Sequence, residues 1–196
     1  MLTVPKDANQ HIQLGLAASQ ADDSASALAH FQRAASAAPE SGIPHFLIGS
    51  ELAAAQRYAE AESAFASAVV LSPEFPLARY QLGLLQFTSG RIPMAMMTWE
   101  PLLQLAQGPL PHFVQGFAAM ATDNFSKAVS LFQEGISRNH DNPALSRDIE
   151  MVIAEIQSKT DSASAAGERM NGAAETDARS EAHVLLANYQ QSGLPH

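Results

Sequence analysis

The sequence of 196 residues contains no cysteine, which excludes disulfides, thiolate metal sites and cysteine nucleophiles. No uninterrupted run of about 18 or more apolar residues occurs, so a membrane-spanning helix is not expected. The N-terminus has no basic stretch followed by an apolar core. We therefore predict no secretory signal and a cytoplasmic location.

Basic residues are also scarce, with 11 Lys and Arg against 20 Asp and Glu, giving a formal net charge of −9. They are dispersed along the chain, whereas a nucleic-acid interface needs clustered cations that neutralise phosphates. Anionic membrane surfaces are disfavoured for the same reason. We therefore expect no nucleic-acid partner. Aromatic and β-branched residues are few, and the abundance of Ala, Leu, Gln and Ser favours helix.

One segment type recurs along most of the chain. Its glycines are spaced 34, 34 and 33 residues apart, at Gly15, Gly49, Gly83 and Gly116. An Ala and an aromatic residue four positions later keep the same register, as Ala27/Phe31, Ala61/Phe65, Ala95/Trp99 and Ala128/Phe132. A fixed period of this length predicts a solenoid of stacked helix pairs, which presents a surface for binding.

Each unit is predicted to hold two helices. In the second unit the first helix begins near Pro44, the second begins at Tyr58, and Pro73 prevents its continuation. Small residues let the two helices approach closely, and the aromatic residue fills the space beside the next unit. This pattern, in four registered copies over residues 8–142, resembles the tetratricopeptide repeat family. The resemblance implies an all-α, right-handed α-solenoid of about four helix pairs.

The third and fourth units depart from the pattern. Pro101 falls inside the second helix of the third unit, where it removes a backbone hydrogen bond and forces a kink. Gly135 stands in the fourth unit where the pattern has Ala. We expect a broken helix at Pro101 and altered curvature between these two units.

Three further segments follow the repeats. Residues 143–157 are predicted to form a capping helix with Asn142 as its N-cap, since a terminal repeat needs a cover for its apolar face. Residues 158–179 have almost no large apolar side chains and are interpreted as a flexible linker. Residues 180–196 regain apolar residues and are predicted to form a C-terminal helix and tail.

In the resembled family the first helix of every unit lines a concave groove. Carried over to this sequence, the resemblance implies a partner-binding strip that is mostly apolar and aromatic. Its predicted members are Ile12, Leu16, Phe46, Ser50, Leu77, Tyr80, Leu84, Phe87, Phe113, Phe117 and Met120. The Lys, Arg and Asn clamp with which some relatives bind acidic tails is not reproduced at these positions.

The predicted function is therefore protein–protein interaction, as an adaptor, scaffold or assembly factor that binds an apolar peptide or amphipathic helix. Two alternatives are a chaperone that shields a hydrophobic segment of a secreted or membrane client, and a self-associating structural protein. The chain's own C-terminal helix is a further candidate occupant, in cis or in a homodimer, through Val184, Leu185, Leu186 and Tyr189. No catalytic motif, metal site or cofactor site is recognised, so we predict that the protein is not an enzyme.

Overall fold

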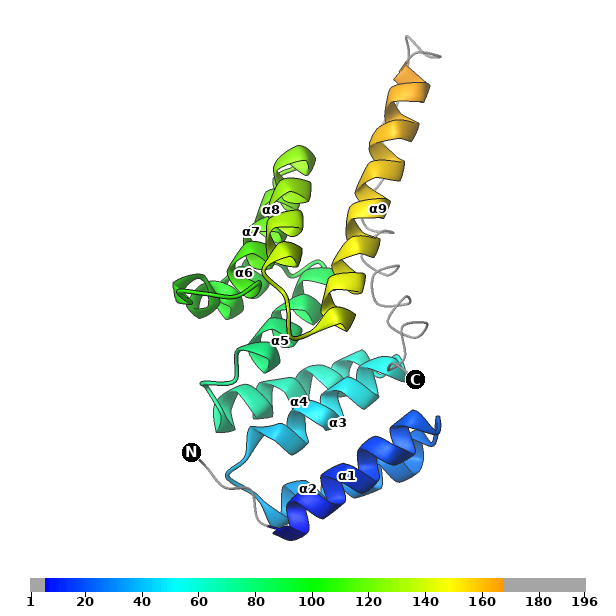
Figure 1. The fold of residues 1–196 in the computed structure, drawn as a ribbon, viewed down its shortest axis with the longest axis vertical. Helices are drawn as coiled ribbons and strands as arrows, with labels where there is room; N and C mark the ends of the chain where they lie inside the picture. The colour runs from blue at the N-terminus through cyan, green and yellow to red at the C-terminus, as the bar shows by residue number, and fades with distance from the viewer. Residues whose placement is uncertain (1–5, 168–196) are drawn as a thin grey trace. The chain divides into compact units, whose positions relative to one another are not determined.

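The computed structural model describes residues 6–167, and all the regular structure in this range is helical (Figure 1). The all-α class predicted from the sequence is confirmed. The helices are α1 (Lys6–Gln20), α2 (Ser24–Ala37), α3 (Gly42–Ala54), α4 (Tyr58–Leu71), α5 (Pro76–Thr88), α6 (Ile92–Trp99), the 3₁₀ helix η1 (Glu100–Gln104), α7 (Leu110–Met120), α8 (Phe125–Ser137) and α9 (Pro143–Gly167).

The helices pack in consecutive antiparallel pairs, as the repeat predicts. The pairs are α1 with α2, α3 with α4, α5 with α6, and α7 with α8. The described helices divide into two compact units, an N-terminal unit that ends at Trp99 and a C-terminal unit that begins at Glu100. In the N-terminal unit, successive pairs are joined by packing of α2 on α3 and of α4 on α5. Each unit is described by itself below.

The repeated glycine lies directly under the repeated aromatic ring of its own helix pair. A Cβ atom built on Gly49 would stand only 2.7 Å from Cδ1 of Phe65, and equally severe overlaps arise between Gly15 and Phe31 and between Gly83 and Trp99. The paired Ala61 is completely buried. The sequence predicted that the ring fills space beside the next unit, and Phe65 does share a buried cluster with Leu82 and Leu85 of α5. Its contact with the glycine, however, is made within its own unit. The glycine and the aromatic residue therefore recur with the repeat because the two helices of each pair approach closely at this point.

The turn between the two helices of each pair has a repeated backbone conformation. Asp22, Gln56, Gly90 and Asp123 occupy equivalent positions and have φ values of 58°, 60°, 76° and 56°. In the second pair the amide of Gln56 donates to the carbonyl of Ala53 at 2.9 Å, and that of Arg57 donates to Leu52 at 2.8 Å. These two bonds form a Schellman motif, which satisfies the last carbonyls of the first helix.

The left-handed conformation of this turn predicts that exchanging its residue destabilises the fold in one repeat and stabilises it in another. Gly90→Ala places a Cβ in a left-handed conformation and is expected to destabilise the fold by about 1 kcal/mol. Gln56→Gly relieves the same strain and is expected to stabilise it by about 0.5 kcal/mol after the added freedom of the unfolded chain is subtracted. Urea denaturation of both variants measures these differences. Equal signs for the two substitutions would contradict the assignment of the turn.

The second helix of the third pair is short. Helix α6 ends at Trp99, and η1 takes over at Glu100, so the α-helix does not continue through Pro101. The predicted break is therefore confirmed, because proline cannot donate the hydrogen bond that the next turn requires. The change of curvature that we expected between the third and fourth units stays a prediction.

Helix α9 begins as predicted but ends later. Its first residue is Pro143, and the side chain of Asn142 accepts a hydrogen bond from the amide of Leu145 at 3.1 Å. The helix packs against α8, and five of its apolar residues are buried: Leu145, Ile149, Val152, Ile153 and Ile156. It continues to Gly167, so the assignment of 158–167 to a flexible linker is wrong. Ala163, Ala165 and Ala166 favour helix in this stretch, which has no large apolar side chain. The predicted linker residues 168–179 and the predicted helix at 180–196 lie outside the described residues.

Helix α9 also carries a carboxyl group whose protonation affects stability. Burial raises the pKa of Asp148 to about 6, and the positive charge of Arg147 acts in the opposite direction. The unfolded chain has a lower pKa, near 3.9. The folded state thus binds more protons between these values, and this group's contribution to stability falls as pH rises from about 4 to about 6. We expect Asp148→Asn to remove this decline and to raise the melting temperature at pH 7.5. A lower melting temperature of the variant at that pH would contradict the expectation.

Candidate functional site

The structure separates the predicted partner-binding residues into two groups. Ile12, Tyr80, Phe113 and Phe117 are buried, with exposed fractions of 8%, 1%, 0% and 1%. Leu16, Phe46, Ser50, Leu77, Leu84, Phe87 and Met120 are only partly buried. The expectation that all eleven line an open surface is therefore wrong for the first four.

The buried aromatic residues serve the packing of their own helix pairs. The ring of Phe113 lies against Gly135 of α8, where a Cβ atom would overlap it, which explains the glycine found there in place of alanine. The ring of Phe117 meets that of Phe132 edge-on, with centroids 5.0 Å apart. Sequence position alone did not separate these core residues from surface residues, since both kinds fall on the same face of a first helix.

Tyr80 is held in the core of the third pair. Its ring stacks on Trp99 at a centroid distance of 6.0 Å. Its backbone carbonyl accepts a hydrogen bond of 2.9 Å from the indole Nε1 of Trp99. This buried arrangement fixes the aromatic residue of α6 against α5 and removes Tyr80 from the candidate surface.

The partly exposed residues of the N-terminal unit form a set that we call the first-helix strip. Its members occupy repeat positions two, five, nine and twelve on α1, α3 and α5, and all but one are apolar. Ile43, which is 40% exposed, shares repeat position two with Leu77 and joins the set. The first-helix strip comprises Leu16, Ile43, Phe46, Ser50, Leu77, Leu84 and Phe87. Met120 lies at position twelve of the fourth repeat, in the C-terminal unit, and is not a member of the strip.

Packing beneath the strip fixes its aromatic side chains. Phe46 contacts Phe75 edge-on at a centroid distance of 4.9 Å and lies 5.7 Å from Phe65. Phe87 lies 5.8 Å from the ring of Trp99. Each of these rings therefore has one side against the core, which restricts its rotamers and leaves an ordered apolar surface.

Three polar side chains close in sequence to strip residues are engaged in hydrogen bonds or have a lowered pKa. The hydroxyl of Ser19 on α1 donates to the carboxylate of Glu51 on α3 at 2.8 Å, which joins the first helices of two successive pairs. The hydroxyl of Ser50 donates to the carbonyl of Phe46 at 3.0 Å. Burial lowers the pKa of His45, so this imidazole is neutral near pH 7. The strip thus favours an apolar ligand over a charged one.

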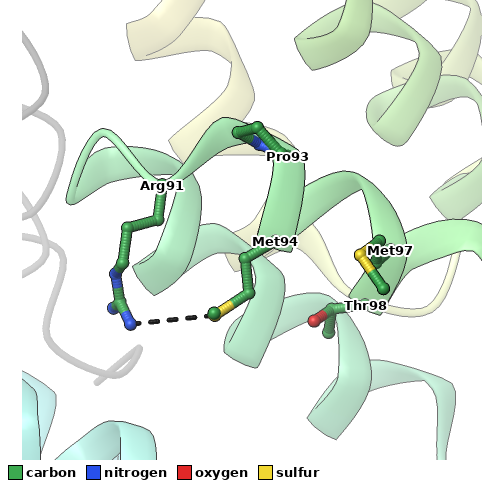
Figure 2. Close-up of a pocket in the computed structure, with 5 residues that line it drawn as sticks. All are labelled: Arg91, Pro93, Met94, Met97 and Thr98. Carbon is green, nitrogen blue, oxygen red and sulfur yellow. Dashed lines mark hydrogen bonds between the residues drawn. The ribbon is translucent and has the colours of Figure 1, made fainter.

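A depression on α6 is a second candidate (Figure 2). It is lined by Arg91, Pro93, Met94, Met97 and Thr98, all from one helix and the residue before it. The guanidinium of Arg91 already donates two hydrogen bonds, of 2.6 and 2.9 Å, to the carboxylate of Glu62. The hydroxyl of Thr98 donates to the side-chain oxygen of Gln86 at 2.6 Å. A small-molecule site needs enclosing walls and convergent polar groups. One helix with engaged polar groups does not provide them.

Other kinds of site are not seen among residues 6–167. None of the helices in this range has the length and apolar character that crossing a bilayer requires. The same range holds no group of three or more His, Cys, Asp or Glu side chains placed to bind one metal ion. The predicted self-docking residues Val184, Leu185, Leu186 and Tyr189 lie outside the described range.

No protein-family model matches the chain. No curated protein sequence matches it either. Among solved structures, a crystal structure of MamA superposes with a TM-score of 0.56 and 18% identity, covering 68% of this chain and 79% of MamA. MamA from Desulfovibrio magneticus RS-1, from residue 41 to its end, gives a TM-score of 0.58 and 14% identity, covering 97% of each chain. A double mutant of MamA RS-1 gives the same score and identity and covers 97% of this chain and 96% of that one. The chain thus has the fold of MamA, a tetratricopeptide-repeat protein.

Proposed function

We propose that this protein is an interaction module that holds an apolar segment of a partner protein on its first-helix strip. The observation that carries the proposal is that partly exposed apolar side chains fall at repeat positions two, five, nine or twelve on each of three consecutive first helices. Six of the seven strip residues are apolar, and two of them, Phe46 and Phe87, pack on the buried rings of Phe65 and Trp99. A tetratricopeptide-type fold presents a surface of this kind for proteins.

The partner that fits best is an amphipathic helix or an extended apolar peptide. The strip residues come from successive first helices, so one ligand would meet them through side chains several positions apart along its own sequence. Acidic tails fit poorly, because the carboxylate of Glu51 follows the strip residue Ser50 on α3. We further propose that the protein acts as an adaptor or scaffold in the cytoplasm and that it does not catalyse a reaction.

The chain's own C-terminal segment stays a candidate occupant of the strip. Residues 184–189 carry Val184, Leu185, Leu186 and Tyr189 in a sequence whose apolar character matches the strip. A homodimer that exchanges this segment would satisfy the same chemistry as an external partner. A chain that ends at residue 178, compared with the full chain by sedimentation at several concentrations, separates the two cases.

Affinity capture from the native host tests the proposal. We expect Leu84→Glu to remove at least nine tenths of the specifically captured partner, because a carboxylate would have to be buried against the partner's apolar side chains. Val70→Glu is the matched control, since Val70 is 78% exposed on the second helix α4. It should leave capture unchanged. Equal capture by wild type and by a folded Leu84→Glu variant would move the contact away from the strip.

A further inference from the structure

Two histidines face each other across the first helix pair. His11 lies on α1 and His30 on α2, and their Nδ1 atoms are 3.2 Å apart. The ring centroids are separated by 5.4 Å, and the ring planes are inclined by 32°. Both side chains are half-buried. Two imidazole nitrogens thus approach within hydrogen-bond distance at the surface of the N-terminal unit.

The pair is not a consequence of the repeat. His45 and His112 occupy the position of His11 in the second and fourth repeats, but the position of His30 is held there by Ala64 and Leu131. Only the first of the four repeats therefore places an imidazole on both helices. Packing of the solenoid does not require it, and the position opposite His11 is free to carry another role.

From this geometry we infer that His11 and His30 form a binding site for a divalent transition-metal ion of the Zn²⁺ class. Zinc binds imidazole nitrogen at about 2.0–2.1 Å in tetrahedral geometry, so two such nitrogens on one ion stand about 3.3–3.4 Å apart. The observed 3.2 Å is close to that separation. Small rotations of the two rings would turn both Nδ1 lone pairs toward one ion.

When a metal ion replaces the hydrogen bond between His11 and His30, the two rings together keep the same number of protons. In the metal-free pair one ring donates its Nδ1–H to the lone pair of the other. On binding, the donor ring changes tautomer by taking up a proton at Nε2 and releasing the one at Nδ1, so both Nδ1 lone pairs coordinate the ion and the number of bound protons is unchanged. Water would complete the coordination, because residues 6–167 contain no group of three ligand side chains.

Such a site would join α1 to α2 without touching the first-helix strip. With two protein ligands, it should bind more weakly than a structural zinc site, which has four. The ion would bind the folded pair and not the unfolded chain, so it should stabilise the N-terminal unit. The inference stands independently of the proposed function.

Calorimetric titration of the metal-free full chain with Zn²⁺ tests the site. Wild type should bind one ion more tightly, by at least tenfold, than the double variant His11→Gln/His30→Gln, and Zn²⁺ should raise the melting temperature of wild type but not of this double variant. Each single variant should lose the site completely, since one imidazole alone does not chelate. His45→Gln/His112→Gln removes the same number of histidines and should bind like wild type. With all variants folded by circular dichroism, unchanged affinity in the double variant, or retention of the site by either single variant, would overturn the inference.

Discussion

Trp99→Ala is expected to lower the free energy of unfolding by about 3–5 kcal/mol, the range found when a large buried aromatic is truncated. Trp99 is completely buried in the N-terminal unit and is the only tryptophan of the chain. Its removal leaves a cavity beside Tyr80 and Phe87 and takes the hydrogen-bond donor away from the buried carbonyl of Tyr80. Urea denaturation followed by far-ultraviolet circular dichroism measures the loss.

Trp99→Phe is the matched control for this prediction. It keeps an aromatic ring over Gly83 but removes the indole donor, so we expect a smaller loss of about 1–3 kcal/mol, the cost of an unsatisfied buried acceptor. An alanine variant that loses less than the phenylalanine variant would show that Trp99 does not fill the core of the third pair.

Gly116→Ala is expected to destabilise the C-terminal unit by about 1–3 kcal/mol, the usual cost of overpacking. Alanine favours a helix over glycine by about 1 kcal/mol, so the sign of the effect is informative. The added Cβ would overlap the ring of Phe132, which is completely buried and already packed on Phe117. The ring therefore has no free direction in which to move.

A double-mutant cycle isolates this clash. In a Phe132→Leu background the smaller side chain leaves room for the new methyl group, and Gly116→Ala should become neutral or stabilising there. The coupling between the two positions is then expected to exceed about 1 kcal/mol. Additive effects of the two substitutions would contradict the role given to the repeated glycine.

The helix pairs could be predicted from the sequence because their repeating contacts are made by rare residue types. Glycine at Gly49 and an aromatic at Phe65 recur in register only where two helices must approach closely. The positions of Pro73 and Asn142 fixed helix ends through backbone chemistry that does not depend on tertiary packing. The continuation of α9 to Gly167 was missed, because the sequence interpretation relied on large apolar residues, and a stretch without them can still extend an existing helix.

The candidate site was predicted less well than the fold. Repeat positions identify which residues face one side of a first helix, but they do not say how far the neighbouring helix covers them. Phe46 and Tyr80 share repeat position five, yet the first is partly exposed and the second is buried against Trp99. The pairing of His11 with His30 was also missed, since it joins residues 19 positions apart that only the packing of α1 on α2 brings together.

Photo-crosslinking tests the binding proposal most directly. A photoreactive phenylalanine analogue is placed at Leu84 in the strip, at Phe46 as a second strip position, and at Val70 on the opposite helix of a pair as the control. After irradiation in the native host, the crosslinked peptides are identified by mass spectrometry. We predict that both strip positions capture the same apolar segment of one protein and that Val70 does not. Capture of that segment from Val70 alone would contradict the proposed binding surface.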